Sequence, residues 1–229
     1  CIACGVCAEK CPKKVEDEFN EGLSQRKAAF VKYPQAVPLK YSIDEETCIY
    51  FAKKGKCKAC EKFCPAGAVD FAQEDKIHRL EVGAVILAPG FRTFRPEAYD
   101  YGYGTYANVV TGTEFERVLS ASGPFEGRLV RPSDGKAPKK IAWLQCVGSR
   151  DTQRGAHGYC SGVCCMYAIK EAVIAREHAH GDLDTAIFFM DMRTYGKDFE
   201  RYYDRAREES GVRFIRSRVH SIEPVAPGS

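Results

Sequence analysis

The sequence contains no long apolar segment. Its longest uninterrupted apolar run lies around Val85–Ala88, far below the roughly 20 residues that a membrane-spanning helix needs. No basic leader with an apolar stretch and a small-residue cleavage site comes before the first motif, so nothing argues for secretion. We therefore expect no transmembrane segment, and a cytoplasmic location is the default expectation.

The sequence also lacks a dominant charge. It has 34 Lys and Arg residues against 31 Asp and Glu residues, a formal net charge of +3. Nucleic-acid-binding proteins usually carry a clear basic excess, so nucleic acid is not expected as the main partner.

The 229 residues, 45% of them hydrophobic, are enough for one large domain or two smaller ones. The chain begins at Cys1 without a methionine and stops at Ser229, and we expect it to be part of a longer protein.

Cysteine, by contrast, is abundant, with twelve residues that fall in three groups. Such grouping argues for metal binding rather than for a disulfide scaffold. The first group, followed by Pro12, has the spacing CxxCxxCxxxCP of bacterial ferredoxins, in which three thiolates hold one cluster and the fourth normally serves a second. Its members are Cys1, Cys4, Cys7 and Cys11.

A partner motif follows, as this spacing requires. It consists of Cys48, Cys57, Cys60 and Cys64, with Pro65 after them and an insertion between the first two. Crosswise ligation, as in two-cluster ferredoxins, predicts one cluster on Cys1, Cys4, Cys7 and Cys64, and another on Cys11, Cys48, Cys57 and Cys60. Structural zinc is the alternative, since CxxC pairs also form zinc ribbons. Each motif offers more thiolates in one loop than a tetrahedral ion takes, which favours iron–sulfur clusters.

The third group has no standard ferredoxin spacing. It comprises Cys146, Cys160, Cys164 and Cys165, and the last two stand at the start of an expected helix, whose positive end would favour a negatively charged cluster. The residues alone leave three alternatives open: a third cluster, buried reduced cysteines, or a redox-active disulfide next to a flavin.

The first part of the chain gives mixed local signals. Apolar spacing predicts a helix in Asp17–Phe30, and short apolar runs predict strands at Ala68–Phe71 and at Val82–Gly90. Thr113 and Glu116 fit a capping box that starts a further helix.

In the last part of the chain, segments with a strand pattern alternate with segments with a helix pattern, which predicts a βαβαβ unit with a parallel sheet. The loop after its first strand has about 17 residues, where about 2 to 6 are usual, and such long loops are normally functional. The expected elements are strand Ile141–Gln145, helix Val163–Ala179, strand Thr185–Met190, helix Asp198–Glu209 and a strand from Val212.

Long blocks of the sequence carry a family resemblance. They include DEFNEGLSQRKA, PQAVP, VGAVILAPGF, TGTEFERVLSASGP, QCVGSRD and YCSGVCCMYAIKEA. Through these blocks the chain resembles, almost end to end, the A subunit of heterodisulfide reductases and its relatives, which include a quinone-interacting oxidoreductase subunit. The resemblance implies a ferredoxin-like two-cluster domain inserted in a thioredoxin-reductase-like, Rossmann-type flavoprotein fold that is present here only in part, hence a mixed α/β and α+β class.

The resemblance also implies FAD. Val82–Phe91 is similar to the second FAD motif of such flavoproteins, with Pro89 in place of the usual Thr, while the first motif, GxGxxG, is absent from this sequence. The FAD contacts implied here are Gly83, Ala88, Pro89, Gly90 and Phe91. A cation near the flavin ring stabilises its reduced form, and the resemblance gives this role to Lys170, although a surface lysine is the alternative.

The resemblance raises the third cysteine group to a third [4Fe-4S] site. Where an ordinary reductase has its NAD(P)-binding glycine loop, this chain has cysteines. Asp191 stands where a ribose-binding acid could be, but a solvent-exposed strand end is the stronger interpretation. Four lysines around Cys57 could dock an acidic electron donor or simply be solvated; they are Lys53, Lys54, Lys56 and Lys58.

Taken together, the motifs and the resemblance predict an electron-transfer oxidoreductase subunit that relays electrons between FAD and [4Fe-4S] clusters and supports electron bifurcation. A ferredoxin-type carrier without a catalytic flavin is the alternative. The expected domains are 1–77 (ferredoxin-like), 78–136 (part of an FAD-binding domain) and 137–229 (second dinucleotide-binding-like unit). Expected partners are redox subunits similar to heterodisulfide reductase B and C or linked to a hydrogenase, with ferredoxin and a homodimeric core as further options.

Overall fold

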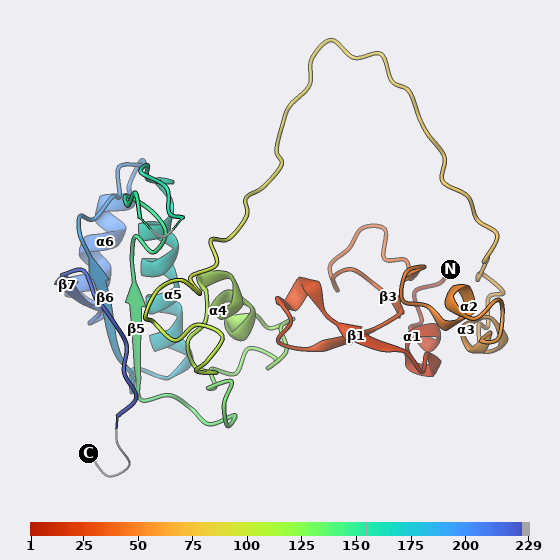
Figure 1. The fold of residues 1–229 in the computed structure, drawn as a ribbon, viewed down its shortest axis with the longest axis horizontal. Coiled ribbons are helices and arrows are strands. Elements are labelled where there is room, and N and C mark those ends of the chain that lie inside the picture. The colour runs from red at the N-terminus through yellow and green to blue at the C-terminus, as the bar shows by residue number, and fades with distance from the viewer. Residues whose placement is uncertain (154, 226–229) are drawn as a thin grey trace. The chain divides into compact units, whose positions relative to one another are not determined.

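The computed structural model describes residues 1–153 and 155–225 (Figure 1). The chain divides into two compact units, Cys1–Phe91 and Arg92–Ser229, and each is described by itself. Both contain helices and small sheets, so the structure is of the mixed α and β type. Among the described residues, none of the helices has the length and apolar character needed to cross a lipid bilayer.

The first unit is built from short elements (Figure 1). Two antiparallel strand pairs, β1 with β2 and β3 with β4, stand among short helices, of which α1 and α3 pack together. The elements are α1 (Val6–Lys10), β1 (Lys14–Glu16), the 3-10 helix η1 (Glu18–Asn20), β2 (Gln25–Lys27), β3 (Ala29–Phe30), β4 (Ser42–Ile43), α2 (Ile49–Ala52) and α3 (Ala59–Lys62).

The helix expected at Asp17–Phe30 is wrong, because this segment forms the turn and the second strand of the β1–β2 hairpin. The Asp17 carboxylate accepts hydrogen bonds from the Phe19 amide at 3.1 Å and from the Asn20 side chain at 2.9 Å. Gly22 then takes a positive φ of 78°, a conformation that glycine adopts at little cost. These local bonds reverse the chain, so that Val15 pairs with Arg26 across β1 and β2.

The two strands expected later in this unit are also absent from the described structure. Ala68–Phe71 forms turns and coil. Val82–Gly90, drawn in yellow in Figure 1, is extended and exposed, with Ile86 at 93% and Leu87 at 84% exposure. A strand needs a neighbouring strand to pair its backbone groups, and no described segment lies alongside this one as a strand.

The second unit contains the expected parallel sheet, in the order β5-β6-β7. Ile141 pairs with Thr185 and Phe188 with Ile215, both in parallel register. The alternation of strands and helices predicted from the sequence is confirmed within one or two residues at each boundary. The elements are α4 (Gly112–Leu119), β5 (Lys140–Leu144), α5 (Cys164–His178), β6 (Asp184–Phe189), α6 (Phe199–Glu208) and β7 (Arg213–Arg216).

Helix α5 forms the centre of this unit, in contact with α4, α6 and β6. Its inner side presents Ala168, Ala172 and Ala175, all fully buried, and these small side chains allow the neighbouring elements to approach closely. Ile187 in the middle of β6 is also fully buried. At about 25 cal/mol per Å² of buried apolar surface, this core is the main stabilising contribution.

Helix α4 has a capping box, but with other residues than expected. The Thr111 hydroxyl accepts from the Glu114 amide at 3.2 Å, and the Glu114 carboxylate accepts from the Thr111 amide. The expected pair, Thr113 and Glu116, lies one half-turn further on, inside the helix. Both pairs fit the same sequence pattern, and the extended backbone at Thr111 selects the earlier one.

We predict that Thr111→Ala weakens helix α4 by about 1 kcal/mol, as the loss of an N-cap usually does. Hydrogen exchange of the helix amides should become roughly fivefold faster. Thr113→Ala is the matched control and should have the smaller effect, since the Thr113 hydroxyl lies within the helix and forms a hydrogen bond with Thr93 Oγ1, at 3.3 Å, rather than with a helix amide. Faster exchange in the control than in Thr111→Ala would contradict the assignment of the cap.

Candidate metal centres

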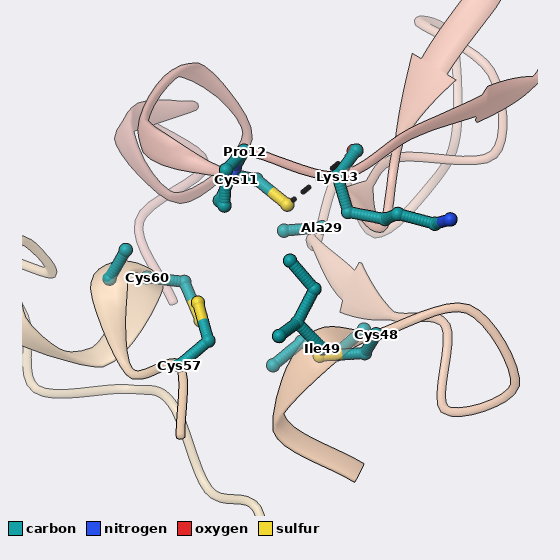
Figure 2. Close-up of a pocket in the computed structure, with 10 residues that line it drawn as sticks. Cys11, Pro12, Lys13, Ala29, Cys48, Ile49, Cys57 and Cys60 are labelled. Atoms are coloured by element: carbon teal, nitrogen blue, oxygen red, sulfur yellow. Dashed lines mark hydrogen bonds between the residues drawn. The ribbon is translucent and has the colours of Figure 1, made fainter. Parts of the chain in front are cut away.

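Four cysteines from three segments line one narrow cavity of about 10 Å³. Figure 2 shows Cys11 reaching it from the end of α1, Cys48 from the start of α2, and Cys57 with Cys60 from the region where α3 begins. The cavity wall is otherwise mainly apolar and includes Ile49. Burial raises the pKa of Cys60, because the charged thiolate loses its hydration.

The remaining four cysteines of the two motifs line a second, wider cavity of about 610 Å³; they are Cys1, Cys4, Cys7 and Cys64. The Ala68 amide donates a hydrogen bond to Cys64 Sγ at 3.3 Å. Backbone donors at Ala68 and its neighbours lower the pKa of Cys64 and so favour its thiolate.

Each cavity therefore combines three cysteines of one motif with the fourth cysteine of the other. Cys11, the fourth of the first motif, lies with Cys48, Cys57 and Cys60. Cys64, the fourth of the second motif, lies in the other cavity. This is the grouping that crosswise ligation requires, and ligation itself stays a prediction.

The third group gathers where the sheet meets helix α5. Cys146 follows β5, Cys160 lies in the long loop, and Cys164 and Cys165 open α5. The four thiols are close enough to influence one another electrostatically. The Cys164 thiol donates to Cys165, which raises the pKa of Cys164 and lowers that of Cys165 to about 6. The Gly162 amide donates to Cys160 Sγ at 3.4 Å.

All twelve cysteines are free thiols. Within residues 1–153 and 155–225, no three His, Cys, Asp or Glu side chains converge closely enough to hold a single metal ion.

Asp191 forms ion pairs that the sequence did not reveal. It stands just after β6, and its carboxylate contacts the Arg150 guanidinium at 2.8 Å and the Arg216 guanidinium at 3.4 Å. The hydrogen bond from Arg150 and the surrounding arginine charges lower the pKa of Asp191. Arg150, in the long loop after β5, was missed by the sequence reasoning, because only the fold brings it to Asp191.

The residues expected at the flavin fall into different units. Lys170 lies on α5, and its ammonium group pairs with Glu116 of α4 at 2.5 Å. The segment with Gly83, Ala88, Pro89, Gly90 and Phe91 belongs to the first unit and is exposed. The FAD contacts therefore stay a prediction.

No family model matches the chain, but curated relatives do. It is 52% identical over 223 residues to an iron-sulfur A subunit of the CoB–CoM heterodisulfide reductase of Methanopyrus kandleri. It is 45% identical over 225 residues to the corresponding iron-sulfur A subunit of Methanocaldococcus jannaschii, and 43% identical over 223 residues to the A subunit of the H(2):CoB-CoM heterodisulfide,ferredoxin reductase of Methanothermobacter thermautotrophicus. The chain belongs to the family of heterodisulfide reductase A subunits.

These matches include 97% of the chain but 33% of each relative, so the chain spans about a third of the length of these heterodisulfide reductase A subunits. Two of the relatives are named as iron–sulfur subunits. The resemblance predicted from the sequence blocks is thereby confirmed.

A buried carboxyl in this heterodisulfide reductase A-like chain was also missed by the sequence reasoning. Glu171 on α5 is 1% exposed, and its Oε2 accepts a hydrogen bond from Trp143 Nε1 at 2.8 Å. Its Oε1 is buried and has no hydrogen-bond partner among the described residues. Loss of hydration raises the pKa of Glu171 to about 8.

We predict that Glu171 makes folding stability depend on pH. Because its folded-state pKa lies above the ordinary value of 4.5, its contribution is fully present below pH about 4.5 and is lost as the pH rises through about 8. The loss can reach about 1.4 kcal/mol per pH unit. Glu171→Gln keeps an acceptor for Trp143 and should flatten this decline in urea unfolding midpoints measured from pH 5 to 9. Glu177→Gln, at an exposed position of the same helix, is the matched control, and equal curves for both variants would contradict the prediction.

Proposed function

We propose that the chain is the electron-transfer part of a heterodisulfide reductase A-like oxidoreductase and holds its electrons in [4Fe-4S] clusters. One observation supports this best: the eight cysteines of two ferredoxin-type motifs form two sets of four, each completed by a thiol from the other motif. Two-cluster ferredoxins exchange their fourth ligand in the same way.

The donor set fits iron–sulfur clusters. All the proposed ligands are thiols, and backbone amides donate to Cys64 and Cys160. Hydrogen bonds to the sulfurs are among the factors that set cluster potentials. The names of the relatives as iron–sulfur subunits support the same assignment over structural zinc.

For the third group, we propose a third [4Fe-4S] cluster bound by Cys146, Cys160, Cys164 and Cys165. The four thiols gather at the start of α5, a helix of 15 residues. The positive end of a helix dipole favours a bound anion. The lowered pKa of Cys165 agrees with a thiolate at this position.

The flavin part of the proposal rests on the family. FAD, when bound, exchanges electrons in pairs or singly and thereby links two-electron donors to one-electron clusters. Lys170 would face the flavin, with Glu116 holding its ammonium group, and Val82–Phe91 would supply part of the binding segment. The parallel sheet of the second unit fits a Rossmann-type, dinucleotide-binding-like domain at 137–229, after a ferredoxin-like domain at 1–77 and part of an FAD domain at 78–136.

The proposed partners are other redox subunits of a multi-subunit complex in the cytoplasm, either similar to the B and C subunits of heterodisulfide reductase or linked to a hydrogenase. The names of the relatives include ferredoxin and F(420)H(2) as electron carriers, and electron bifurcation and a homodimeric core belong to the same proposal. The exposed lysines Lys53, Lys54, Lys56 and Lys58 around Cys57 offer a docking surface for an acidic carrier.

We predict about twelve iron and about twelve sulfide per chain after anaerobic reconstitution, as three four-iron clusters require. A measured content of about eight iron and about eight sulfide would exclude the third cluster. A colourless protein that binds zinc would contradict the whole proposal. Flavin analysis of the full-length protein separates the two redox alternatives: clusters without FAD would favour a ferredoxin-type carrier over the flavoprotein.

A further inference from the structure

A partly buried cation lies at the third cysteine group. Arg150 belongs to the loop between β5 and α5, and its backbone amide donates to the Tyr159 carbonyl at 3.1 Å. The Ser149 hydroxyl donates to the same carbonyl at 2.7 Å. These bonds tie the two halves of the loop together, so that the position of Arg150 is fixed relative to Cys160, the residue after Tyr159.

Asp191 holds the Arg150 side chain from the end of β6. Arg150 Nη2 donates to Asp191 Oδ2 at 2.8 Å, and the side chain of Arg150 is 24% exposed. The Asp191 carbonyl in turn lies 3.9 Å from Cys165 Sγ. One residue thus contacts both the cation and a proposed cluster ligand, so the guanidinium is anchored beside the thiols.

The charge of Arg150 acts on two thiols of the group. It lies beside Cys146, where it opposes the rise in pKa that burial causes. The hydrogen bond from Cys164 is the largest cause of the lowered pKa of Cys165, and Arg150 adds a smaller contribution in the same direction. Its Nη1 atom is buried and has no hydrogen-bond partner among the described residues. A buried N–H donor without a partner is costly, and a sulfur of a cluster held by these thiols would accept its hydrogen bond.

We propose that Arg150 tunes the reduction potential of the third cluster, and that Asp191 positions Arg150 for this role. A cation and its N–H donors stabilise the more negative, reduced state, so Arg150 makes this cluster easier to reduce. The inference rests on the proposed function, since it requires a cluster on Cys146, Cys160, Cys164 and Cys165.

The test is a redox titration of the reconstituted full-length protein, followed by electron paramagnetic resonance. Arg150→Gln should shift the one-electron equilibrium of the third cluster toward the oxidised form about tenfold, equivalent to ~59 mV, and leave the other clusters unchanged. Arg216→Gln is the matched control, because it removes the same charge from the other side of Asp191, where the side chain is 77% exposed. Equal shifts in both variants, or no shift in Arg150→Gln, would overturn the proposal.

Asp191→Asn tests the positioning role by the sign of its effect. Removing a negative charge alone would make the cluster easier to reduce, whereas releasing Arg150 would make it harder. We expect Asp191→Asn to make the third cluster harder to reduce, that is, to lower its reduction potential. A raised potential would refute the positioning role of Asp191.

Iron analysis keeps the outcomes separate. A wild-type protein with about eight iron would show that the third cluster, and so that part of the proposed function, is absent. If Arg150→Gln loses iron, Arg150→Lys is measured next, because it keeps the positive charge. An Arg150→Lys variant that retains the third cluster near the wild-type potential supports the proposal. Iron loss in both variants would mean that Arg150 is needed to assemble the site, and would overturn the proposal.

Discussion

The packing of helix α1 against helix α3 is the contact on which the first unit depends. Each helix carries one cysteine and is followed by another: Cys7 lies in α1 with Cys11 after it, and Cys60 lies in α3 with Cys64 after it. When the two helices pack, the cysteine that follows each helix reaches the cavity of the other motif. Neither motif has four thiols in its own cavity, so neither can complete a site alone. Helix α1 also packs against strand β3.

The second unit also brings cysteines from separate segments together, but it does so with regular secondary structure. A parallel sheet brings the ends of neighbouring strands to one edge, and there the loop after β5, the end of β6 and the start of α5 meet. A charged pair lies beside the thiols at this edge, formed by Arg150 and Asp191. In the first unit, the cavity of Cys11, Cys48, Cys57 and Cys60 has mainly apolar walls. The cavity of Cys1, Cys4, Cys7 and Cys64 is also lined by the acidic residues Glu45, Asp70, Glu74 and Asp75. Different surroundings of this kind give [4Fe-4S] clusters different potentials, and the electron relay proposed above would depend on such differences.

The sequence predicted those features that depend on local pattern or fixed spacing. The parallel sheet and its helices follow from alternating apolar segments, and the cysteine groups from their spacing. The hairpin after Asp17 was missed, because the apolar spacing of Phe19, Leu23 and Phe30 outweighed the turn formed by Asp17 and Gly22. The apolar run Val82–Gly90 was expected as a strand, although a strand also needs a neighbour that pattern alone does not supply. Side-chain pairs such as Arg150 with Asp191 and Trp143 with Glu171 join residues far apart in the sequence, and no local signal identifies them.

The exchange of the fourth ligand between the two motifs can be measured directly. Three single variants, Cys7→Ala, Cys11→Ala and Cys57→Ala, would be reconstituted anaerobically, reduced, and compared by electron paramagnetic resonance. If the cavities define the clusters, Cys11→Ala and Cys57→Ala alter the same signal, and Cys7→Ala alters the other. If instead Cys7→Ala and Cys11→Ala alter one signal together and Cys57→Ala the other, each motif binds its own cluster, and the crosswise arrangement is wrong.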